Sequence, residues 1–527
     1  MGFPYDDLRS WIADLEKEGQ LCRVTAEVDW RFELGAVVRK TWDEYGLSSP
    51  ALLFENIKDY KPPKPHRVFV GSLQSYDRIA LALGLPIGTH PRDIAETYRE
   101  RIKKPIKPEI VETGPVKENI VSGEEVDLTM FPIPYWHERD GNRYIGTLTC
   151  TITKDPDTGW INVGNYRQML LDKRSQTVLM EPGRSHIGLH YLKYIERNEP
   201  MPVAVAIGQD PCNVLVTIGE LPVGACEWDY AGGLRGKPVR LTKAETSDLL
   251  VPADAEIVIE GTIDPKERAM EGPFGEFTGY YSSLPSPKPV IRVKCITFRN
   301  DPIFQGTLEG YPPNEDHVMI SVVYSALTKE YLINAGVPGV VDVCHPVSAC
   351  AWGTTIVSIK PVSVAHAMRV ATALWGHYLA WALHKIVIVV DEDIDPWDWE
   401  MVNWAMNWRV EPSRDVYVIP KTYGDPLDPS IAPEDKPYQG RLLIDATRPF
   451  DWKPREAWGS EGVGKGVPLK YPPVNRPALE VMEYVNGRWP EYKIERAKKY
   501  TGRDTGYFKM WWTPEFIRAL REGKITP

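Results

Sequence analysis

Two glutamates flank a short Gly-Pro-Phe-Gly segment between Glu271 and Glu276. Proline fixes its backbone φ, and the two glycines allow conformations that other residues avoid. The two carboxylates would therefore lie on a rigid turn that another group can approach closely. In such a pair, one carboxyl can act as a general acid and the other as a general base. This segment alone is also compatible with a surface turn that carries two solvated glutamates.

Three further side chains are suited to a divalent ion. Asn162 lies in a strand-like run, His186 follows a second run, and Glu227 comes after another. An amide oxygen, an imidazole nitrogen and a carboxylate would suit such an ion and leave positions for phosphate oxygens or water. From their spacing alone, residues of these types are more often hydrogen-bonded structural residues than metal ligands.

Two familiar motifs are incomplete. His186 and His190 have the spacing of zinc ligands on a helix, but Ile187 stands where a zinc protease has its general base. Residues 459–466 resemble a phosphate-binding loop, yet Gly466 replaces the hydroxyl residue that would hold Mg²⁺. We therefore expect neither a zinc protease nor a nucleotide triphosphate site.

The composition is that of a globular protein with more than one core. The chain has 527 residues, a net charge of −10 and interleaved charge signs, which argues against a nucleic-acid-binding face. We expect the basic segment 101–107 to be a solvated linker. The seven cysteines include no CxxC pair, which favours a reducing, cytoplasmic compartment. We find no secretion signal and no apolar run near the ~18 residues of a membrane span.

Changes in hydrophobic pattern divide the chain into four parts. Residues 1–120 predict an N-terminal α+β cap, whose first helix is capped by Asp6 or Asp7. Residues 121–320 predict a β-barrel-like domain. Residues 321–450 predict an α/β domain with a helix over 363–383 and a buried strand over 384–391. The tail 451–527 predicts helices near 478–486 and 514–522. The strand-like runs of the second part are 147–153, 160–171, 177–180, 203–207, 214–218, 255–260 and 290–298.

Four large side chains repeat at helical spacing in the third part. Trp397, Met401, Trp404 and Trp408 are four, three and four residues apart. Such a stripe is more typical of a helix face in the core than of a cofactor site.

Together, these segments resemble the UbiD family of decarboxylases, which use prenylated FMN. The resemblance covers most of the chain and fades after about residue 450. It implies a multidomain α+β and α/β fold: an N-terminal cap, a central split β-barrel that binds the flavin, and a C-terminal α/β domain with a helical tail. The matching motifs are Asn162 with Arg167, Glu181-Pro182 followed by His186-Ile187, Glu227, the 271–276 segment, and Lys385 leading into the acidic segment 391–395.

The resemblance also implies how the cofactor is bound. It makes Asn162, His186 and Glu227 ligands of a divalent ion, typically Mn²⁺, that ties the cofactor phosphate to the protein. Backbone carbonyls near Val216, Thr217 and Gly219 would bind K⁺. The other residues expected at the cofactor are Val163, Gly164, Asn165, Tyr166, Arg167, Ser185 and Lys385.

A catalytic network is implied by the same resemblance. Arg167, Glu271 and Glu276 would form it, with Glu276 exchanging the proton and Arg167 holding the substrate carboxylate and the flavin. The oxidised prenylated flavin supplies an electron sink for the carbon that loses CO₂. Burial and a neighbouring acid would raise the pKa of Glu276 toward useful proton exchange.

Strand geometry raises an objection to this placement. Residues five apart on one strand face opposite sides, whereas Asn162 and Arg167 should both reach one cofactor. A bulge at Gly164 would insert one residue and bring both side chains to the same side.

The resulting hypothesis is a non-oxidative decarboxylase of an aromatic, heteroaromatic or conjugated acid, with the direction of the reaction left open. The partners expected are a small carboxylic acid, CO₂ and a prenylated-flavin synthase that supplies the cofactor. We expect a homodimer or homohexamer, with the tail in subunit contacts. The alternative is a non-catalytic flavin-binding or cofactor-handling protein.

Two side chains outside the shared motifs are candidates for the substrate pocket. Phe277 comes directly after Glu276 and could stack on a planar acid. His317, at the end of segment 311–317, could hydrogen-bond a ring substituent. Alternatively, His317 simply lies in the first turn of a helix that begins near Val318.

Overall fold

The computed structural model describes residues 3–180, 182–377, 383–459, 465–475, 477 and 479–492. The chain forms two compact units, Met1–Phe450 and Asp451–Pro527. Glu181, the helix expected near 514–522 and most of the glycine-rich segment 459–466 lie outside the described residues. In the part that the structure describes, no helix is both long and apolar enough to cross a membrane.

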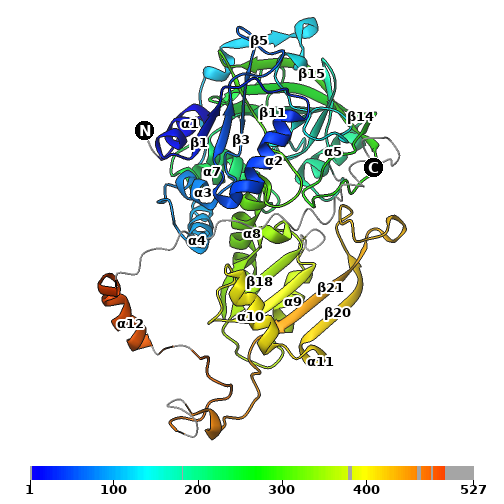
Figure 1. The fold of residues 1–527 in the computed structure, drawn as a ribbon. Coiled ribbons are helices and arrows are strands. Elements are labelled where there is room, and N and C mark those ends of the chain that lie inside the picture. The colour runs from blue at the N-terminus through cyan, green and yellow to red at the C-terminus, as the bar shows by residue number, and fades with distance from the viewer. Residues whose placement is uncertain are drawn as a thin grey trace, which may run out of the picture. The chain divides into compact units, whose positions relative to one another are not determined.

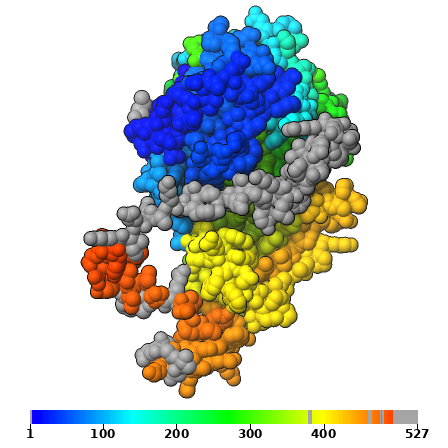
Figure 2. Space-filling model, viewed as in Figure 1, coloured from blue at the N-terminus to red at the C-terminus, as the bar shows by residue number. Residues whose placement is uncertain are grey.

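The N-terminal elements surround a four-stranded sheet (Figure 1). The side chain of Asp7 caps the first helix by accepting a hydrogen bond from the Ser10 amide, which confirms the expected cap. One strand of this sheet comes from far along the chain, because β16 pairs in parallel with β3. The N-terminal residues form a continuous blue surface in Figure 2. The elements are α1 (Leu8–Lys17), β1 (Leu21–Val24), α2 (Glu33–Tyr45), β2 (Ala51–Phe54), β3 (Arg67–Val70), α3 (Tyr76–Ala82), α4 (Pro91–Ile102) and β16 (Ile303–Gln305).

The central part is a nine-stranded sheet with three helices and a small three-stranded sheet. The large sheet has the order β6-β9-β10-β15-β14-β11-β7-β8, and β5 pairs with β15. Its strands are β5 (Asn119–Ser122), β6 (Tyr144–Gly146), β7 (Cys150–Lys154), β8 (Ile161–Gly164), β9 (Gln168–Asp172), β10 (Ser175–Thr177), β11 (Met201–Ile207), β14 (Ile257–Glu271) and β15 (Ser286–Phe298). The other elements are α5 (His186–Arg197), α6 (Pro211–Val216), α7 (Glu227–Arg235), β4 (Glu109–Ile110), β12 (Arg240–Lys243) and β13 (Leu250–Pro252).

A short connection shows that this large sheet is curled. Strand β8 forms one end of the sheet, whereas β9 lies near the other end, and only residues 165–167 connect them. Four Cα steps reach at most ~14 Å, so the two ends must lie close together. Side chains bridge them, since Gln168 Nε2 donates to Thr151 Oγ1 at 2.8 Å and the Thr149 amide donates to Asn165 Oδ1 at 2.9 Å. The expected split barrel in a multidomain α+β fold is therefore confirmed.

Two local expectations for this part are wrong. The run 160–171 is not one strand with a bulge at Gly164, because the chain leaves β8 there and enters β9 at Gln168. The run 214–218 is not a strand either, since helix α6 covers most of it. Asp210 caps that helix and Pro211 occupies its first turn, and these two start signals outweigh the β-branched residues that come after them.

The third part is a five-stranded sheet with helices on both faces. The central strands β18, β19 and β21 run parallel, and the edge strands β17 and β20 are antiparallel to their neighbours. Alternate residues of β19 pack toward α9 and toward α10, as a strand buried on both faces requires. The elements are α8 (Glu315–Asn334), β17 (Val340–Cys344), β18 (Thr354–Ile359), α9 (His366–Trp375), β19 (Ile386–Asp391), α10 (Trp399–Arg409), α11 (Pro412–Asp415), β20 (Val416–Tyr423) and β21 (Tyr438–Ala446).

The tryptophan stripe faces the core only in part, because Trp397 and Met401 pack against buried clusters and the other two members do not. Trp397 lies before α10, and the side chains of Trp404 and Trp408 are 40% and 74% exposed. The helix instead buries Val402 and Ala405 against the sheet. Aromatic size and spacing alone did not indicate which side of this helix meets the core.

The second unit contains one α-helix among its described residues, α12 (Leu479–Gly487), which confirms the helix expected near 478–486. Earlier in this unit the rings of Trp452 and Tyr471 stack with centroids 5.5 Å apart. The participation of this tail in subunit contacts stays a prediction.

A buried histidine ties α8 to the loop after β17. His345 is fully buried, with Nδ1 3.0 Å from the Ala351 carbonyl and Nε2 3.0 Å from Thr328 Oγ1. A carbonyl can only accept, so Nδ1 carries the proton and Nε2 accepts from the hydroxyl. Burial lowers the pKa of His345 to about 4, although the Ala351 carbonyl opposes this shift.

We therefore predict that acid destabilises the protein partly through His345. The folded-state pKa lies below the unfolded value of about 6.5, so stability is complete above that pH and falls as the pH drops toward 4. The full loss from this one group would be ~3 kcal/mol. Scanning calorimetry should show a weaker pH dependence over this range for His345→Asn.

If His345→Asn and the unmodified protein lose melting temperature in parallel from pH 6.5 to 4, then His345 is not one of the groups that cause acid destabilisation.

Candidate functional site

Arg167 lies between the two glutamates of the 271–276 segment. Its Nε and Nη2 atoms donate to Glu271 at 3.0 and 2.9 Å, and Nη1 donates to Glu276. Glu271 is the last residue of β14, Arg167 immediately precedes β9, and Glu276 lies on the loop before β15. Both carboxylates are almost fully buried, at 1% and 4% exposure. The structure therefore brings together the three residues expected to form a catalytic network.

Tyr144 is a fourth member of this network. Its hydroxyl donates to Glu271 at 2.6 Å. Its ring lies 4.3 Å from that of Phe274, which also lies under the Arg167 guanidinium at 5.2 Å. Tyr144 was not predicted from the sequence, because it occupies the first position of a short strand and belongs to no motif of its own.

The loop that carries Glu276 is held by the segment before β6. Asp140 accepts hydrogen bonds from the Gly275 amide at 2.9 Å and from the His137 amide at 3.1 Å. The Gly141 amide donates to the Pro273 carbonyl at 2.7 Å. A Cβ at Gly141 would lie only 2.2 Å from the Gly272 carbonyl oxygen, so this close approach requires glycine. The Asp140-Gly141 pair was a turn signal that could have drawn attention to this segment.

Burial dominates the electrostatics of Glu276. Burial raises its pKa, Arg167 lowers it, and Glu271 and Asp140 raise it again, so that the net shift is upward. Burial likewise raises the pKa of Tyr144, reinforced by Glu271, and keeps this phenol neutral. Glu276 can thus hold a proton at a pH where an exposed glutamate would have lost it.

Two of the residues expected to hold a divalent ion, His186 and Glu227, lie side by side. His186 Nδ1 is 4.0 Å from Glu227 Oε1, and Glu227 Oε2 accepts a hydrogen bond from the Val163 amide at 2.8 Å. Asn162, which precedes Val163 on β8, is 2% exposed. Burial raises the pKa of Glu227, and His186 opposes that shift. A buried oxygen and nitrogen donor set with one acid suits a divalent cation, so these residues fit such an ion.

An acid that was not predicted from the sequence lies on the other side of this ring. Glu220 Oε1 is 3.6 Å from His186 Nε2, which is buried without a hydrogen-bond partner. Burial raises the pKa of Glu220 to about 7, although His186 lowers it. Trp160 packs edge-to-face against His186 with ring centroids 4.8 Å apart.

The other residues of the 162–167 run shape the connection between β8 and β9. The Asn165 side chain accepts from the Thr149 amide and donates to the Thr147 carbonyl. A Cβ at Gly164 would lie 2.6 Å from the ring of Tyr166, so these two residues pack closely. Ser185 caps α5 by accepting from the Gly188 amide, which places His186 at the first position of that helix.

The segment expected to bind K⁺ lies at the C-terminal end of α6. Val216 is its last residue and Thr217 its cap. Carbonyls at a helix C-terminus lack intrahelical partners and carry partial negative charge, which favours a cation. The Thr217 carbonyl accepts from the Asn165 amide at 3.4 Å, and Gly219 packs with Val323.

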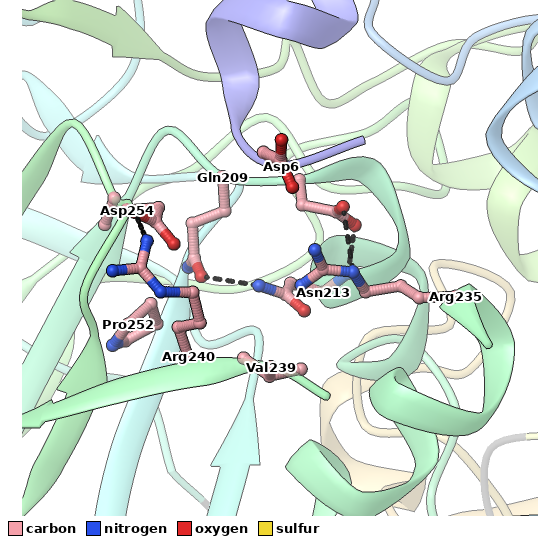
Figure 3. Close-up of a pocket in the computed structure, with 10 residues that line it drawn as sticks. Asp6, Gln209, Asn213, Arg235, Val239, Arg240, Pro252 and Asp254 are labelled. Carbon is pink, nitrogen blue, oxygen red and sulfur yellow. Dashed lines mark hydrogen bonds and ion pairs between the residues drawn. The ribbon is translucent and has the colours of Figure 1, made fainter. Parts of the chain in front are cut away.

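An ion pair fixes α6 against the helix that begins with Glu227. Asp210, the cap of α6, lies 3.3 Å from the Nε atom of Arg235 at the end of α7. Figure 3 shows Arg235 beside Gln209 and Asn213 in the small polar cavity at this end of the two helices. The pair therefore connects the helix with the expected K⁺ segment to the helix with the acidic ligand.

Three further expected site residues have partners within the protein. Lys385 Nζ donates to Asp428 at 2.7 Å and to Ser430 at 2.8 Å. His317 lies in the first turn of α8, is fully buried, and its Nε2 donates to the Phe277 carbonyl at 2.7 Å. The ring of Phe277 lies 5.2 Å from that of Trp352. The roles of Lys385, Phe277 and His317 toward a cofactor or substrate stay predictions.

Family models match almost the whole of the first unit. Residues 12–98 match the N-terminal domain of 3-octaprenyl-4-hydroxybenzoate carboxy-lyase, the UbiD family. Residues 109–312 match its Rift-related domain, and residues 317–446 match its C-terminal domain.

Individual relatives agree with these matches. A pyrrole-2-carboxylic acid decarboxylase of Pseudomonas aeruginosa is 34% identical over 457 residues, which are 84% of this chain and 91% of the relative. The closed form of the vanillic acid decarboxylase of Sedimentibacter hydroxybenzoicus is 31% identical, covers 93% of this chain and 99% of its own, and has a TM-score of 0.81. The UbiD-class enzyme HmfF of Pelotomaculum thermopropionicum, in an evolved dimeric form with prFMN, is 30% identical over 85% of this chain and 96% of its own, with a TM-score of 0.73.

We predict that His186→Ala and Glu227→Gln each lower the content of bound divalent ion and of flavin in the purified protein at least ~10-fold. Each change removes a ligand from the ion that would tie the cofactor phosphate to the protein. Elemental analysis and flavin absorbance measure the two contents. The control is Glu196→Gln, an exposed acid on the same helix α5. Normal ion and flavin contents in a folded His186→Ala protein would contradict the ligand assignment.

Proposed function

Because this chain belongs to the UbiD family and is a carboxy-lyase, we propose that it decarboxylates an aromatic, heteroaromatic or conjugated carboxylic acid with prenylated FMN as cofactor. The observation that carries the proposal is the buried network of Arg167 with Glu271 and Glu276. The names of the relatives support the substrate class, because two of them act on ring acids, pyrrole-2-carboxylic and vanillic acid. HmfF, in complex with prFMN, supports the cofactor. A purely flavin-handling protein would not require this network.

The proposal also assigns groups of this chain that would hold the cofactor. Asn162, His186 and Glu227 would bind Mn²⁺ or a similar divalent ion at the phosphate, as their buried donor atoms support. The carbonyls of Val216, Thr217 and Gly219 would hold K⁺. Lys385 would reach the phosphate by exchanging its contact with Asp428 for one with the cofactor. When bound, the prenylated flavin supplies the electron sink for decarboxylation.

Arg167 would bind the substrate carboxylate. A guanidinium has five N–H groups, and in this network three of them donate to Glu271 and Glu276. The remaining two N–H groups lie one on each terminal nitrogen and can donate to a carboxylate. Glu271, held by Arg167 and Tyr144, keeps the guanidinium from turning away.

Glu276 would exchange the proton. Loss of CO₂ leaves an electron pair on carbon, and the Glu276 carboxyl replaces CO₂ with a proton at that carbon, so that R–CO₂⁻ and H⁺ become R–H and CO₂. Its raised pKa keeps the proton available until it is needed. In the carboxylation direction the ionised Glu276 would remove the same proton. The network thus serves both directions.

Assembly, location and cofactor supply also belong to this proposal. We expect a homodimer or homohexamer, a cytoplasmic location, and dependence on a prenylated-flavin synthase for the cofactor. The seven cysteines, all unpaired thiols in the structure, support the reducing compartment. HmfF exists in an evolved dimeric form, which supports an oligomer.

The proposal is tested by co-expressing the chain with a prenylated-flavin synthase and screening ring and conjugated acids for CO₂ release. We expect turnover of at least one acid and a flavin spectrum distinct from that of FMN. A protein that carries the prenylated flavin but releases CO₂ from no acid in a broad panel would overturn the proposed activity.

We predict that Glu276→Gln keeps the flavin and loses turnover ~100-fold or more, because the amide retains the shape and lacks the proton. In the unmodified enzyme, decarboxylation should decline as the pH rises through the raised pKa of Glu276, since only the protonated acid can donate. Glu267→Gln, a partly exposed acid on β14 that pairs with Arg292, is the control. Equal turnover of the flavin-loaded Glu276→Gln enzyme would reject this role.

Tyr144→Phe should lower kcat by ~10- to 100-fold with unchanged flavin and ion content. It removes a hydrogen bond to a buried carboxylate, worth about 1.5 to 3 kcal/mol, and frees Glu271 to move. The matched control is Tyr194→Phe, whose hydroxyl makes only a 3.4 Å contact with the Lys154 carbonyl. Steady-state kinetics at saturating substrate provide the measurement, and a kcat within twofold of the unmodified enzyme would show that Tyr144 does not position Glu271.

A further inference from the structure

The imidazole of His186 lies between two carboxylates that approach different ring nitrogens. Glu227 Oε1 is 4.0 Å from Nδ1, and Glu220 Oε1 is 3.6 Å from Nε2. The ring is 4% exposed, and Glu220 keeps 19% of its side chain accessible. The two carboxylates therefore approach the His186 ring from different sides, one at each ring nitrogen. Any role of Glu220 toward the ion that would hold the cofactor rests on the proposed function.

One ion bound to His186 cannot also bind both Glu227 and Glu220. The lone-pair directions of the two imidazole nitrogens diverge, so a metal at one nitrogen lies far from a ligand that faces the other. In agreement, the described part of the chain contains no group of three His, Cys, Asp or Glu side chains that could hold a metal ion. One of the two carboxylates must serve a different purpose.

The neighbouring residues indicate which side holds the ion. Glu227 Oε2 accepts from the Val163 amide at 2.8 Å, which places this acid against β8, beside Asn162. His186 Nδ1 therefore faces a carboxylate that is fixed against β8, the strand that carries Asn162. On the Nε2 side, Glu220 is the only carboxylate within 4 Å among the described residues. The ion belongs on the Nδ1 side.

A histidine that gives Nδ1 to a metal carries its proton on Nε2, and that N–H needs an acceptor. Nε2 is buried and has no hydrogen-bond partner in the structure. The Glu220 carboxylate is within a small side-chain rotation of hydrogen-bond distance. We propose that Glu220 is a positioning residue that accepts the Nε2–H of His186 and thereby keeps Nδ1 free for the divalent ion.

The position of Glu220 in the chain links the two cation sites. Glu220 comes directly after the segment Val216 to Gly219, whose carbonyls would bind K⁺. Leu221, the next residue, is buried. One short stretch of backbone thus carries the carbonyls for one cation and the carboxylate that orients a ligand of the other. A change in the K⁺ segment would move Glu220 relative to His186.

The test is a Mn²⁺ titration of the metal-free protein followed by electron paramagnetic resonance. We expect Glu220→Ala to weaken Mn²⁺ binding 10- to 100-fold, the range typical of lost outer hydrogen bonds to metal-bound histidines. Glu220→Gln should recover most of the affinity, because its amide oxygen can still accept the N–H. Glu227→Gln should bind more weakly than either, and Glu196→Ala, an exposed acid on α5, should bind normally.

Two results would overturn the role of Glu220. One is normal Mn²⁺ affinity in a Glu220→Ala protein that is folded by circular dichroism. The other is loss of binding in Glu220→Gln with normal binding in Glu227→Gln, which would place the ion on the Nε2 side. Failure of the unmodified protein to bind Mn²⁺ would instead overturn the proposed ion site, and the role of Glu220 with it. Because no substrate is used, the outcome does not depend on knowing which acid the enzyme decarboxylates.

Discussion

Arg167 carries a positive charge with only 9% of its side chain exposed, and such a charge is stable only beside carboxylates that cannot move away. Two carboxylates around one guanidinium give an excess of negative charge if both are ionised. Glu271 receives three hydrogen bonds, two from Arg167 and one from Tyr144. Glu276 receives only one from Arg167, so it is the acid in which burial favours retention of a proton. The division of roles between two chemically identical side chains therefore depends on how many donors each one meets.

The curled sheet supplies the rigidity that this arrangement needs. The connection of residues 165–167 runs between two ends of one sheet, and Arg167 is the last residue before β9. On the other side, the loop with Glu276 is fixed through Asp140 and through the close contact of Gly141 with Gly272. Both partners of the ion pair are thus attached to backbone that has little freedom. Bringing the buried charges together therefore does not require a flexible loop to become ordered.

Predictions from the sequence succeeded where the signal was local or where several motifs occurred in order. The cap of α1, the buried strand β19 and the curled barrel were predicted from such patterns. One local signal was misjudged: β-branched residues suggested a strand over 214–218, but Asp210 and Pro211 just before them begin a helix. The tryptophan stripe of α10 could not reveal that Val402 and Ala405 face the sheet.

The site residues that were not predicted from the sequence depend on contacts between distant parts of the chain. Tyr144 and Asp140 act on groups more than a hundred positions away, so nothing near them in the sequence shows their purpose. Glu220, in the loop after α6, is significant only because of the direction from which it approaches His186 at the start of α5. The types and spacing of residues in the sequence can identify the side chains that carry out the chemistry. The side chains that orient them are recognised only from interatomic distances in the structure.

Strand β16 has a consequence for how the polypeptide is made. It completes the N-terminal sheet beside β3, yet it is formed by residues 303–305, after more than half of the 527 residues. During synthesis the edge strand β3 therefore stays unpaired until the residues of the whole barrel have left the ribosome. An unpaired edge exposed for that long invites mispairing with another nascent chain. The N-terminal part is consequently the first to be translated, and its sheet is among the last to be completed.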